Sequence, residues 1–345
     1  MKAITVGSAT LDIIATIDNS DIEQMTLTNQ TASFLLMEPG RKVDAQSVTT
    51  HTGGGAVNTA ISLARQGYDV FPLVKVGEDI NAEKLFERFK EEDISTALVK
   101  THKEQATAVS LLIASHDRNA AIFTHRGANG FMMDEDIRAE DFEGARIVYV
   151  TNLSNDSAHR FPKIVKQGRQ AGAFVATNPG IRQLTSKTDT LFDSLIDVDL
   201  FICNMVEARA LIPKLVERTG WSKADICPAD ALACLEIEGF RVALKDYAAR
   251  IHSLGPKYVG ITDGGNGAYL SVEGTMYQQE VIETKVAGTT GAGDSFASTL
   301  TASLVYGDSP DKALKLAAHN AASVVSFVDA QTGLHSRKKL LSLVG

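Results

Sequence analysis

Residues 286–296 of the chain are Val-Ala-Gly-Thr-Thr-Gly-Ala-Gly-Asp-Ser-Phe, and a run of small and apolar residues follows them. The glycines allow tight turns and close approach of a ligand to the backbone, and the residues after them predict a helix over Ala292–Val305. A helix that begins in this way presents unpaired N–H groups and a partial positive charge of about +0.5. Glycine-rich turns at helix starts are typical of sites that bind phosphoryl groups.

Asp294 is the one carboxylate of this run. If the backbone amides of Gly291, Ala292 and Gly293 converge on a phosphoryl group, Asp294 lies beside that group and can accept a proton from an attacking hydroxyl. The alternative is that Asp294 only caps the helix, a role that aspartate fills well. These residues alone favour the two interpretations equally.

Two further glycine clusters lie at the ends of predicted elements. Gly53–Gly55 precede a predicted helix over Ala56–Gln66, and a glycine-rich stretch at 264–267 follows a predicted strand over Tyr258–Thr262. The first cluster is not a dinucleotide fingerprint, because Asn58 stands where the third glycine belongs, and the chain has no G-x-x-x-x-G-K-[ST] loop. Taken singly, each cluster is also explained by ordinary turn chemistry.

Predicted strands and helices alternate along most of the chain. The strands are Ala3–Gly7, Val70–Val76, Ile147–Val150, Phe174–Thr177, Leu200–Cys203 and Tyr258–Thr262, and further helices are Ala82–Lys90, Ser157–Ala171 and Pro310–Phe327. Such alternation predicts parallel strands joined by right-handed crossovers. We expect an α/β fold, a three-layer α/β/α sandwich around a mostly parallel central sheet.

Two β-rich stretches, residues 12–51 and 94–127, interrupt this alternation. They predict either a small separate sheet that covers the strand ends as a lid, or a pair of antiparallel embellishments. Residues 208–254 are longer than one crossover needs. We expect a helical insertion there, interrupted at Pro213 and Pro228 because proline cannot donate a hydrogen bond within a helix.

Composition excludes several classes of protein. The 345 residues contain 34 Lys and Arg against 42 Asp and Glu, a net charge of −8, which argues against a nucleic-acid binder. The sequence has no run of 18 apolar residues, so it predicts no membrane span, and its first residues lack the apolar stretch of a secretion signal. The three cysteines favour reduced thiols over disulfides or a zinc site, so we expect a cytoplasmic protein.

Together these motifs resemble the ribokinase-like (PfkB-type) family of carbohydrate kinases. The run Gly291–Phe296 resembles the C-terminal signature of that family, and Gly53-Gly54 followed by Asn58 resembles its N-terminal signature. The other matches, in the order of the family, are Asp12 at the place of a sugar-binding aspartate, Arg126–Asn129 in a stretch seen in ribokinases, Asn204-x-x-Glu207, and a nucleotide loop at 261–267.

The resemblance implies a ribokinase-like fold and transfer of the γ-phosphoryl group of ATP to a hydroxyl of a small sugar. It implies that Asp294 is the base and that the amides of Gly291, Ala292 and Gly293 form the anion hole. The residues that it implies for the acceptor are Asp12, Gly53, Gly54 and Asn58. Those that it implies for ATP are Asn204, Glu207, Thr262, Gly264, Gly267 and His319, with Glu207 positioning Mg²⁺ through water.

Several of these assignments have a structural alternative. Asn204 and Glu207 have the spacing of a capping box, residues 262–267 suit a hairpin turn, and His319 suits a satisfied structural histidine. Gly288 stands where the family has an aspartate associated with a monovalent cation. Because glycine offers only a carbonyl oxygen, this departure argues against dependence on K⁺.

The resemblance also implies a division of the chain. Residues 12–51 and 94–127 would form a discontinuous β lid over the substrate, and residues 1–11, 52–93 and 128–345 would form the kinase core. Lids of this family often mediate dimerisation, so we expect a homodimer through the lid.

Two other functions compete with a sugar kinase. An adenosine or nucleoside kinase of the same family would use Phe34, Leu36 and Phe123 of the predicted lid as walls around the base. A regulator that binds a sugar or nucleotide without catalysis is the second alternative, and the intact Asp294 and glycine loop argue against it.

Overall fold

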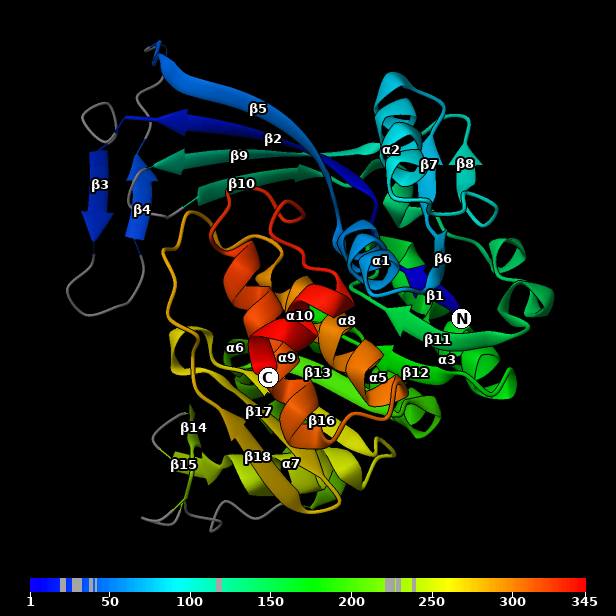
Figure 1. Ribbon diagram of the computed structural model, residues 1–345, viewed down its shortest axis with the longest axis vertical. Helices are drawn as coiled ribbons and strands as arrows, with labels where there is room; N and C mark the ends of the chain where they lie inside the picture. The colour runs from blue at the N-terminus through cyan, green and yellow to red at the C-terminus, as the bar shows by residue number, and fades with distance from the viewer. Residues whose placement is uncertain are drawn as a thin grey trace.

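The computed structural model describes residues 1–18, 23–26, 33–36, 40, 42–115, 120–220, 227, 231–237 and 240–345. Its centre is an eight-stranded sheet with the order β18-β17-β16-β13-β12-β11-β1-β6 (Figure 1). The strands are β1 (Lys2–Val6), β6 (Asp69–Leu73), β11 (Ala145–Val150), β12 (Phe174–Thr177), β13 (Leu200–Asn204), β16 (Tyr258–Thr262), β17 (Ala268–Val272) and β18 (Thr275–Gln279). Neighbours from β6 to β16 pair in parallel, and β17 and β18 add an antiparallel edge.

Helices cover both faces of this sheet, as alternation along its strands requires. On β11, Val148 and Val150 enter one apolar core, and Ile147 and Tyr149 enter the other. The first core also takes buried residues from α3 (Phe161–Gln170), α4 (Gly180–Ser186), α5 (Thr188–Ser194), α6 (Met205–Thr219) and α7 (Leu244–His252). The second takes them from α1 (Gly55–Arg65), α2 (Ile80–Glu91), α8 (Ala292–Val305) and α9 (Pro310–Val324), with α10 (Arg337–Val344) against α9. The predicted three-layer α/β/α sandwich is confirmed.

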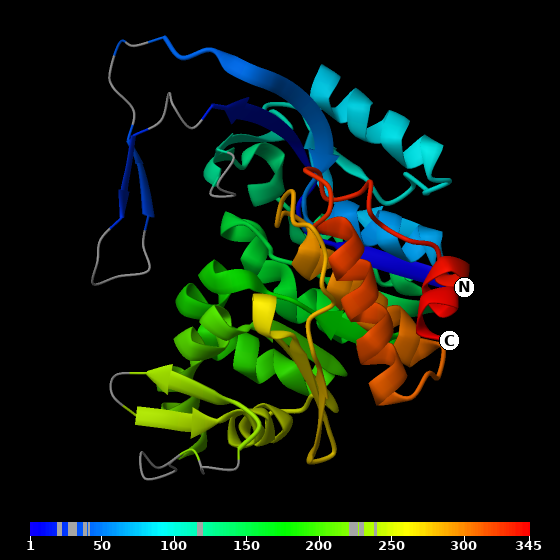
Figure 2. The same cartoon turned by 60° about the vertical axis from the view of Figure 1, so that its left-hand side comes forward.

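A second, four-stranded sheet projects beyond the core, with the order β10-β9-β2-β5 (Figure 2). Its strands are β2 (Thr10–Ile17), β5 (Ala45–Gly53), β9 (Ala108–Ser115) and β10 (Ala120–His125), and β2 pairs with β9 in parallel. The two β-rich stretches of the sequence thus meet in one sheet. A hairpin of β3 (Glu23–Thr26) and β4 (Ser33–Leu36) lies between β2 and β5 along the chain, and β8 (Lys100–His102) pairs with β7 (Lys75–Gly77).

The prediction for residues 208–254 was wrong in two respects. Pro213 does not interrupt the helix, because α6 continues through it to Thr219. Pro213 is exposed while its neighbours Leu211, Ile212 and Leu215 are buried, so packing of the apolar face offsets the roughly 3 kcal/mol that an internal proline costs. The stretch also contains a β-hairpin of β14 (Cys234–Ile237) and β15 (Phe240–Ala243). Pro228 lies outside the described residues.

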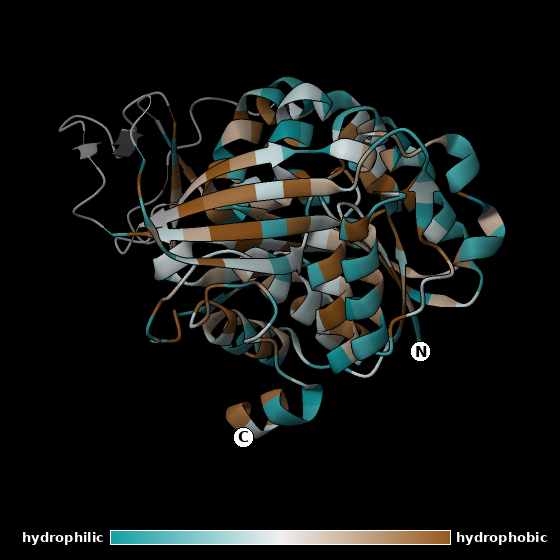
Figure 3. Cartoon of the chain, turned by 90° about the horizontal axis from the view of Figure 1, so that it is seen from above, coloured by the Kyte–Doolittle hydropathy of each residue, from teal (hydrophilic) through white to brown (hydrophobic). Residues whose placement is uncertain are grey.

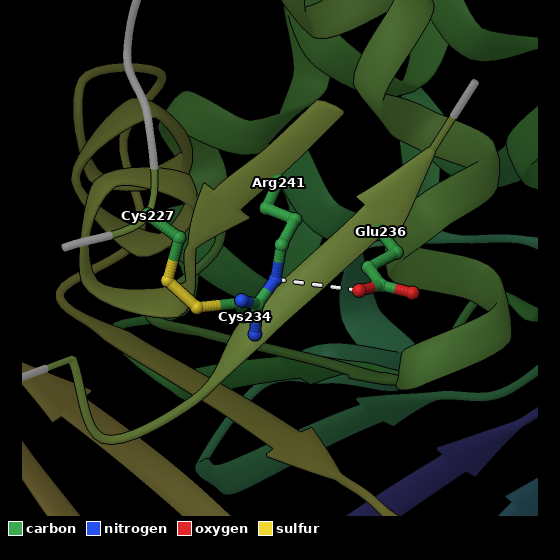
Figure 4. The surroundings of a disulfide bond; sticks show 4 residues. All are labelled: Cys227, Cys234, Glu236 and Arg241. Carbon is green, nitrogen blue, oxygen red and sulfur yellow. Dashed lines mark ion pairs between the residues drawn. A yellow bond between two sulfur atoms is a disulfide. The ribbon is translucent and has the colours of Figure 1, made fainter. Parts of the chain in front are cut away.

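The expectation of reduced thiols was also wrong, because Cys227 and Cys234 form a disulfide (Figure 4). Their Cα atoms are 6.1 Å apart, within the usual range for a bridge. Beside it, Arg241 of β15 pairs with Glu236 of β14 at 3.3 Å. Cys203 is buried and free.

In the part of the chain that the structure describes, no helix combines the length and the apolar character needed to cross a membrane.

Candidate active site

The loop before α8 holds Gly291 in a backbone conformation that residues other than glycine rarely adopt. Gly291 has a φ of +80°, in the left-handed region, and a Cβ built on it would overlap Ala330. The chain then enters α8, whose first-turn amides have no acceptors within the helix. Gly293 is exposed there, and a Cβ on it would meet nothing within 4 Å. The structure thus places the glycine run at an open helix start.

Asp294 lies in the first turn of α8 and is held by Asn58 of α1. The Asn58 Nδ2 donates to the Asp294 Oδ2 at 2.9 Å. Burial raises the pKa of Asp294 to about 6, the Asn58 hydrogen bond lowers it, and the charge of Asp12 raises it. Asp294, Asn58 and Asp12 come from three distant parts of the sequence, and the fold brings them together.

A chain of hydrogen bonds fixes the amide of Asn58. Gln331 donates its Nε2 to the Asn58 Oδ1 at 3.1 Å and to the Thr52 carbonyl at 2.7 Å. Arg88 of α2 donates its Nε to the Gln331 Oε1 at 3.0 Å. Because the Asn58 Oδ1 accepts from Gln331, its Nδ2 must face Asp294. Gln331 and Arg88 were not predicted from the sequence, because their positions carry no local pattern that could have revealed them.

Asp12 of β2 lies against the glycines at the end of β5. A Cβ on Gly53 would collide with the Asp12 carboxylate, and a Cβ on Gly54 would lie 2.5 Å from the Ser8 carbonyl oxygen. Burial raises the pKa of Asp12 to about 6, while a hydrogen bond with Ser110 and the charge of His51 lower it. Gly53 therefore makes room for a carboxylate that the fold partly desolvates, and Gly54 allows the close approach of the Ser8 backbone.

A cavity of about 650 Å³ opens at the start of α8. Five of the predicted residues line it: Thr262, Gly264, Gly267, Ala292 and Gly293. The first three surround the turn of the β16–β17 hairpin, so the turn interpretation of that stretch is confirmed, and their role toward ATP stays a prediction. The remaining wall is mainly apolar and includes Val281, Ile282, Phe296, Ala318, Ala322 and Val325.

Asn204 and Glu207 form the capping box that was their structural alternative. The Asn204 N–H donates to the Glu207 Oε2, and the Glu207 N–H donates to the Asn204 Oδ1, both at 2.9 Å. Burial raises the pKa of Glu207. Burial raises the pKa of Tyr149 too, and the charges of Asp294 and Glu207 add to it, so both carboxylates lie near that phenol. Within the described residues, no cluster of three or more His, Cys, Asp or Glu could hold a metal ion.

The remaining predicted residues lie at the margins. His319 follows the cavity residue Ala318 on α9 but does not itself line the cavity, and burial and the charge of Lys315 lower its pKa. Phe123 of β10 is 56% exposed. The side chains of Phe34 and Leu36 lie outside the described ones. A Cβ on Gly288 would lie 3.1 Å and 3.2 Å from the carbonyl oxygens of Phe327 and Val328.

Comparisons with known proteins show the family to which the chain belongs. Residues 20–337 match the sequence model of the pfkB family carbohydrate kinases. The chain therefore belongs to the PfkB family and is a kinase, an enzyme that transfers a phosphoryl group to an alcohol.

Curated relatives include the ribokinase of Arabidopsis thaliana, 25% identical over 99% of this chain and 80% of that protein, and the deoxyribokinase of Salmonella typhi, 23% identical over 94% and 95%. A bifunctional ribokinase/ribose-5-phosphate isomerase A of Fructilactobacillus sanfranciscensis is 23% identical, and this chain spans 56% of its length.

Solved structures share the fold. The ribokinase of Arabidopsis thaliana in complex with ribose and ATP superposes with a TM-score of 0.74 at 24% identity, covering 99% of this chain and 98% of that one. The Burkholderia thailandensis nucleoside kinase in complex with inosine superposes with a TM-score of 0.74 at 19% identity, covering 99% and 97%.

Proposed function

We propose that this kinase transfers the γ-phosphoryl group of ATP to a hydroxyl of a small sugar, with Asp294 as the base. The observation that carries the proposal is the position of Asp294. It stands in the first turn of α8 directly after Ala292 and Gly293, which line the 650 Å³ cavity, and it accepts a hydrogen bond from Asn58 of the Asp12–Asn58 cluster. A donor nucleotide on one side and an acceptor on the other would meet there. Relatives named ribokinase, one of them solved with ribose and ATP, support this choice.

The cavity suits ATP. Its apolar wall of residues from 281 to 325 can pack on an adenine, and the glycine-rich residues 264–267 allow close backbone approach along the sugar and phosphates. The phosphates would then reach the N-terminus of α8, where amides and the helix dipole favour anions.

Mg²⁺ would be held chiefly by the phosphates and by water. Glu207 fits a supporting role, because one of its oxygens is engaged in the capping box and the other is not required there. One carboxylate acting through water matches the reluctance of Mg²⁺ to lose its hydration shell. When bound, the ion neutralises charge on the phosphates.

The chain's own residues account for the transfer step. Asp294 accepts the proton of the acceptor hydroxyl as that oxygen bonds to the γ-phosphorus, and the bond from the γ-phosphorus to the bridging oxygen breaks to release ADP. The amides of Gly291, Ala292 and Gly293 stabilise charge on the phosphoryl oxygens. Asp12 and Asn58 together accept and donate hydrogen bonds, as the hydroxyls of a sugar require.

The second sheet would close over the acceptor as a lid and exclude water from the phosphoryl group. We assign residues 12–51 and 94–127 to this lid and the rest of the chain to the core. β8 is the exception, because it pairs with β7.

The outer face of the second sheet supports a homodimer. Val48, Leu111 and Phe123 lie on one face of this sheet and expose 62%, 38% and 56% of their surface, and Figure 3 shows apolar residues recurring along these strands. A contiguous apolar patch of this kind on a projecting sheet is typical of a protein interface.

A panel of acceptors tests the proposal. ADP release would be measured with ATP and Mg²⁺ in the presence of neutral sugars, sugar phosphates, sugar acids, nucleosides including inosine and adenosine, or no acceptor. Stimulation by a sugar supports a sugar kinase, and stimulation by nucleosides alone supports the alternative that the solved nucleoside kinase suggests. No stimulation by any member would support the non-catalytic regulator.

A further inference from the structure

A second, smaller cavity of about 120 Å³ lies at the carboxyl ends of β11 and β12. It shares no lining residue with the larger cavity. Three segments of the chain supply polar residues to its lining. Arg126 follows β10, and Asn152 and Ser154 follow β11. Arg182 lies on α4, and Lys187 directly follows that helix. A water molecule takes ~30 Å³ in the liquid, so the space admits one phosphate or carboxylate group with little water.

All charges that line this cavity have the same sign. Arg126, Arg182 and Lys187 contribute, and no aspartate or glutamate does. Among the residues that the structure describes, no carboxylate forms an ion pair with any of the three, although Arg160 on the adjacent segment is paired with Asp134 at 3.1 Å. The cavity therefore holds concentrated positive charge that the protein leaves unneutralised.

The guanidinium group of Arg126 is partly buried and is held by a neighbouring hydroxyl. Its Nη1 donates to the Ser154 Oγ at 2.9 Å, which fixes the guanidinium. Burial lowers the pKa of Arg126, and the positive charge of Arg182 lowers it further. Two such guanidinium groups repel each other until an anion lies between them, and that anion then accepts charge-assisted hydrogen bonds.

The cavity belongs to the acceptor side of the molecule. Just after Arg126, Asn129 exchanges two hydrogen bonds of 3.0 Å with the backbone of Ala9, three residues before Asp12. Just before Asn152, Thr151 contacts Gly55, the residue that follows the Gly53-Gly54 pair. Two flanks of the cavity are thus joined to the segments that carry the proposed acceptor residues.

We infer that Arg126, Arg182 and Lys187 bind an anionic group of the acceptor, so that the acceptor is a phosphorylated sugar or a sugar acid. This inference rests on the proposed function. A neutral sugar would leave the three cations unpaired, whereas a phosphate or carboxylate on the acceptor matches their charge and fixes which end of the sugar faces Asp294.

Matched acceptors test the inference. ADP release would be compared for ribose, ribose 5-phosphate and ribonate, and for glucose, glucose 6-phosphate and gluconate. We expect kcat/KM at least about 100-fold higher for an anionic member than for its neutral sugar. Arg126→Gln and Arg182→Gln would each lower that value about 10- to 100-fold, mainly through KM, because each removes a charge-assisted hydrogen bond. Arg146→Gln, an exposed change near the amino end of β11, would have no effect.

Three results would overturn the inference. The first is an equal or better kcat/KM for the neutral sugars. The second is retention of the preference for anionic acceptors in the Arg126→Gln/Arg182→Gln double variant. The third is an inorganic phosphate that changes turnover of a neutral sugar through the same arginines, since the cavity would then bind a free effector.

Calorimetric titration with inorganic phosphate separates this inference from the proposed function. Binding that the arginine variants lose supports the cavity as an anion site even if no acceptor stimulates ADP release. Absence of binding, together with activity on neutral sugars, would remove the inference and leave the kinase intact. Arg182 is exposed on α4, so its variant should fold normally, which circular dichroism would verify.

Discussion

At the scale of single residues, the central feature is a base whose protonation the fold controls. The unperturbed pKa of aspartate is ~3.9, whereas burial raises the pKa of Asp294 to about 6. A base of this strength still ionises at neutral pH and accepts a proton more readily than a solvated aspartate would. The Asn58 hydrogen bond keeps the pKa from rising further.

A pH profile follows from this value. Since Asp294 must be ionised to act, kcat/KM should fall as pH drops through about 6, about tenfold per pH unit. Asn58→Ala removes a hydrogen bond that lowers the pKa of Asp294, so its acid limb should move to higher pH. Profiles between pH 5 and 9 would show this. Coincident limbs in both enzymes would contradict the assigned base.

We expect the ionised, partly buried Asp12 carboxylate to lower the free energy of unfolding at neutral pH. Its folded pKa of about 6 exceeds the ordinary 3.8, so its contribution to stability is complete below about pH 4 and is lost as pH rises through 6. Asp12→Asn cannot ionise, and it should be more stable than the wild type at pH 8 by on the order of 1–2 kcal/mol. Urea unfolding would measure this difference, which should shrink at pH 5. A less stable variant at pH 8 would contradict the argument.

The candidate catalytic and acceptor residues could be predicted from the sequence, but the residues that hydrogen-bond to them could not. Asp294, Asp12 and Asn58 are carried by motifs with fixed local spacing, and the structure brings them together. Gln331 and Arg88 are 243 positions apart, and such a contact leaves no trace in local spacing. The smaller cavity, which Arg126, Arg182 and Lys187 line, could not be predicted for the same reason, because its residues follow three different elements.

At the scale of elements, periodicity predicted the central strands and most helices, since burial on two faces dictates their pattern. It failed where tertiary packing outweighed a local signal, as at Pro213 within α6. The Cys227–Cys234 bridge was missed because seven positions of separation match no familiar framework. The capping box at Asn204 and Glu207 confirms the structural alternative for that motif, and their role toward ATP and Mg²⁺ stays a proposal.

The start of α8 offers a matched pair of glycine variants. Gly291→Ala would place a Cβ against Ala330 at a φ of +80°, so it should destabilise the fold by at least about 1–2 kcal/mol and abolish most activity. Gly293→Ala meets open space, so its melting temperature should stay at or above that of the wild type. Thermal unfolding of both variants would decide. Equal losses of stability would show that the loop geometry is misassigned.

At the scale of the whole molecule, the second sheet connects the acceptor site with assembly. Its inner face carries Asp12, and its outer face exposes Leu111 and Phe123. If this face forms the dimer, Phe123→Lys should shift sedimentation from dimer to monomer at micromolar concentration. Thr124→Lys, an exposed change on the same strand whose side chain lies on the opposite face, serves as the control. An unchanged dimer in the Phe123 variant would place the interface elsewhere.

The most direct measurement is the turnover of Asp294→Asn with ATP, Mg²⁺ and the best acceptor of the panel. Asn keeps the size of the side chain and removes the base, so we predict a loss of ~10²–10⁴ in kcat with an unchanged fold. Asp311→Asn, an exposed aspartate in the first turn of α9, should be fully active. Full activity of Asp294→Asn would contradict the assignment of Asp294 as the base.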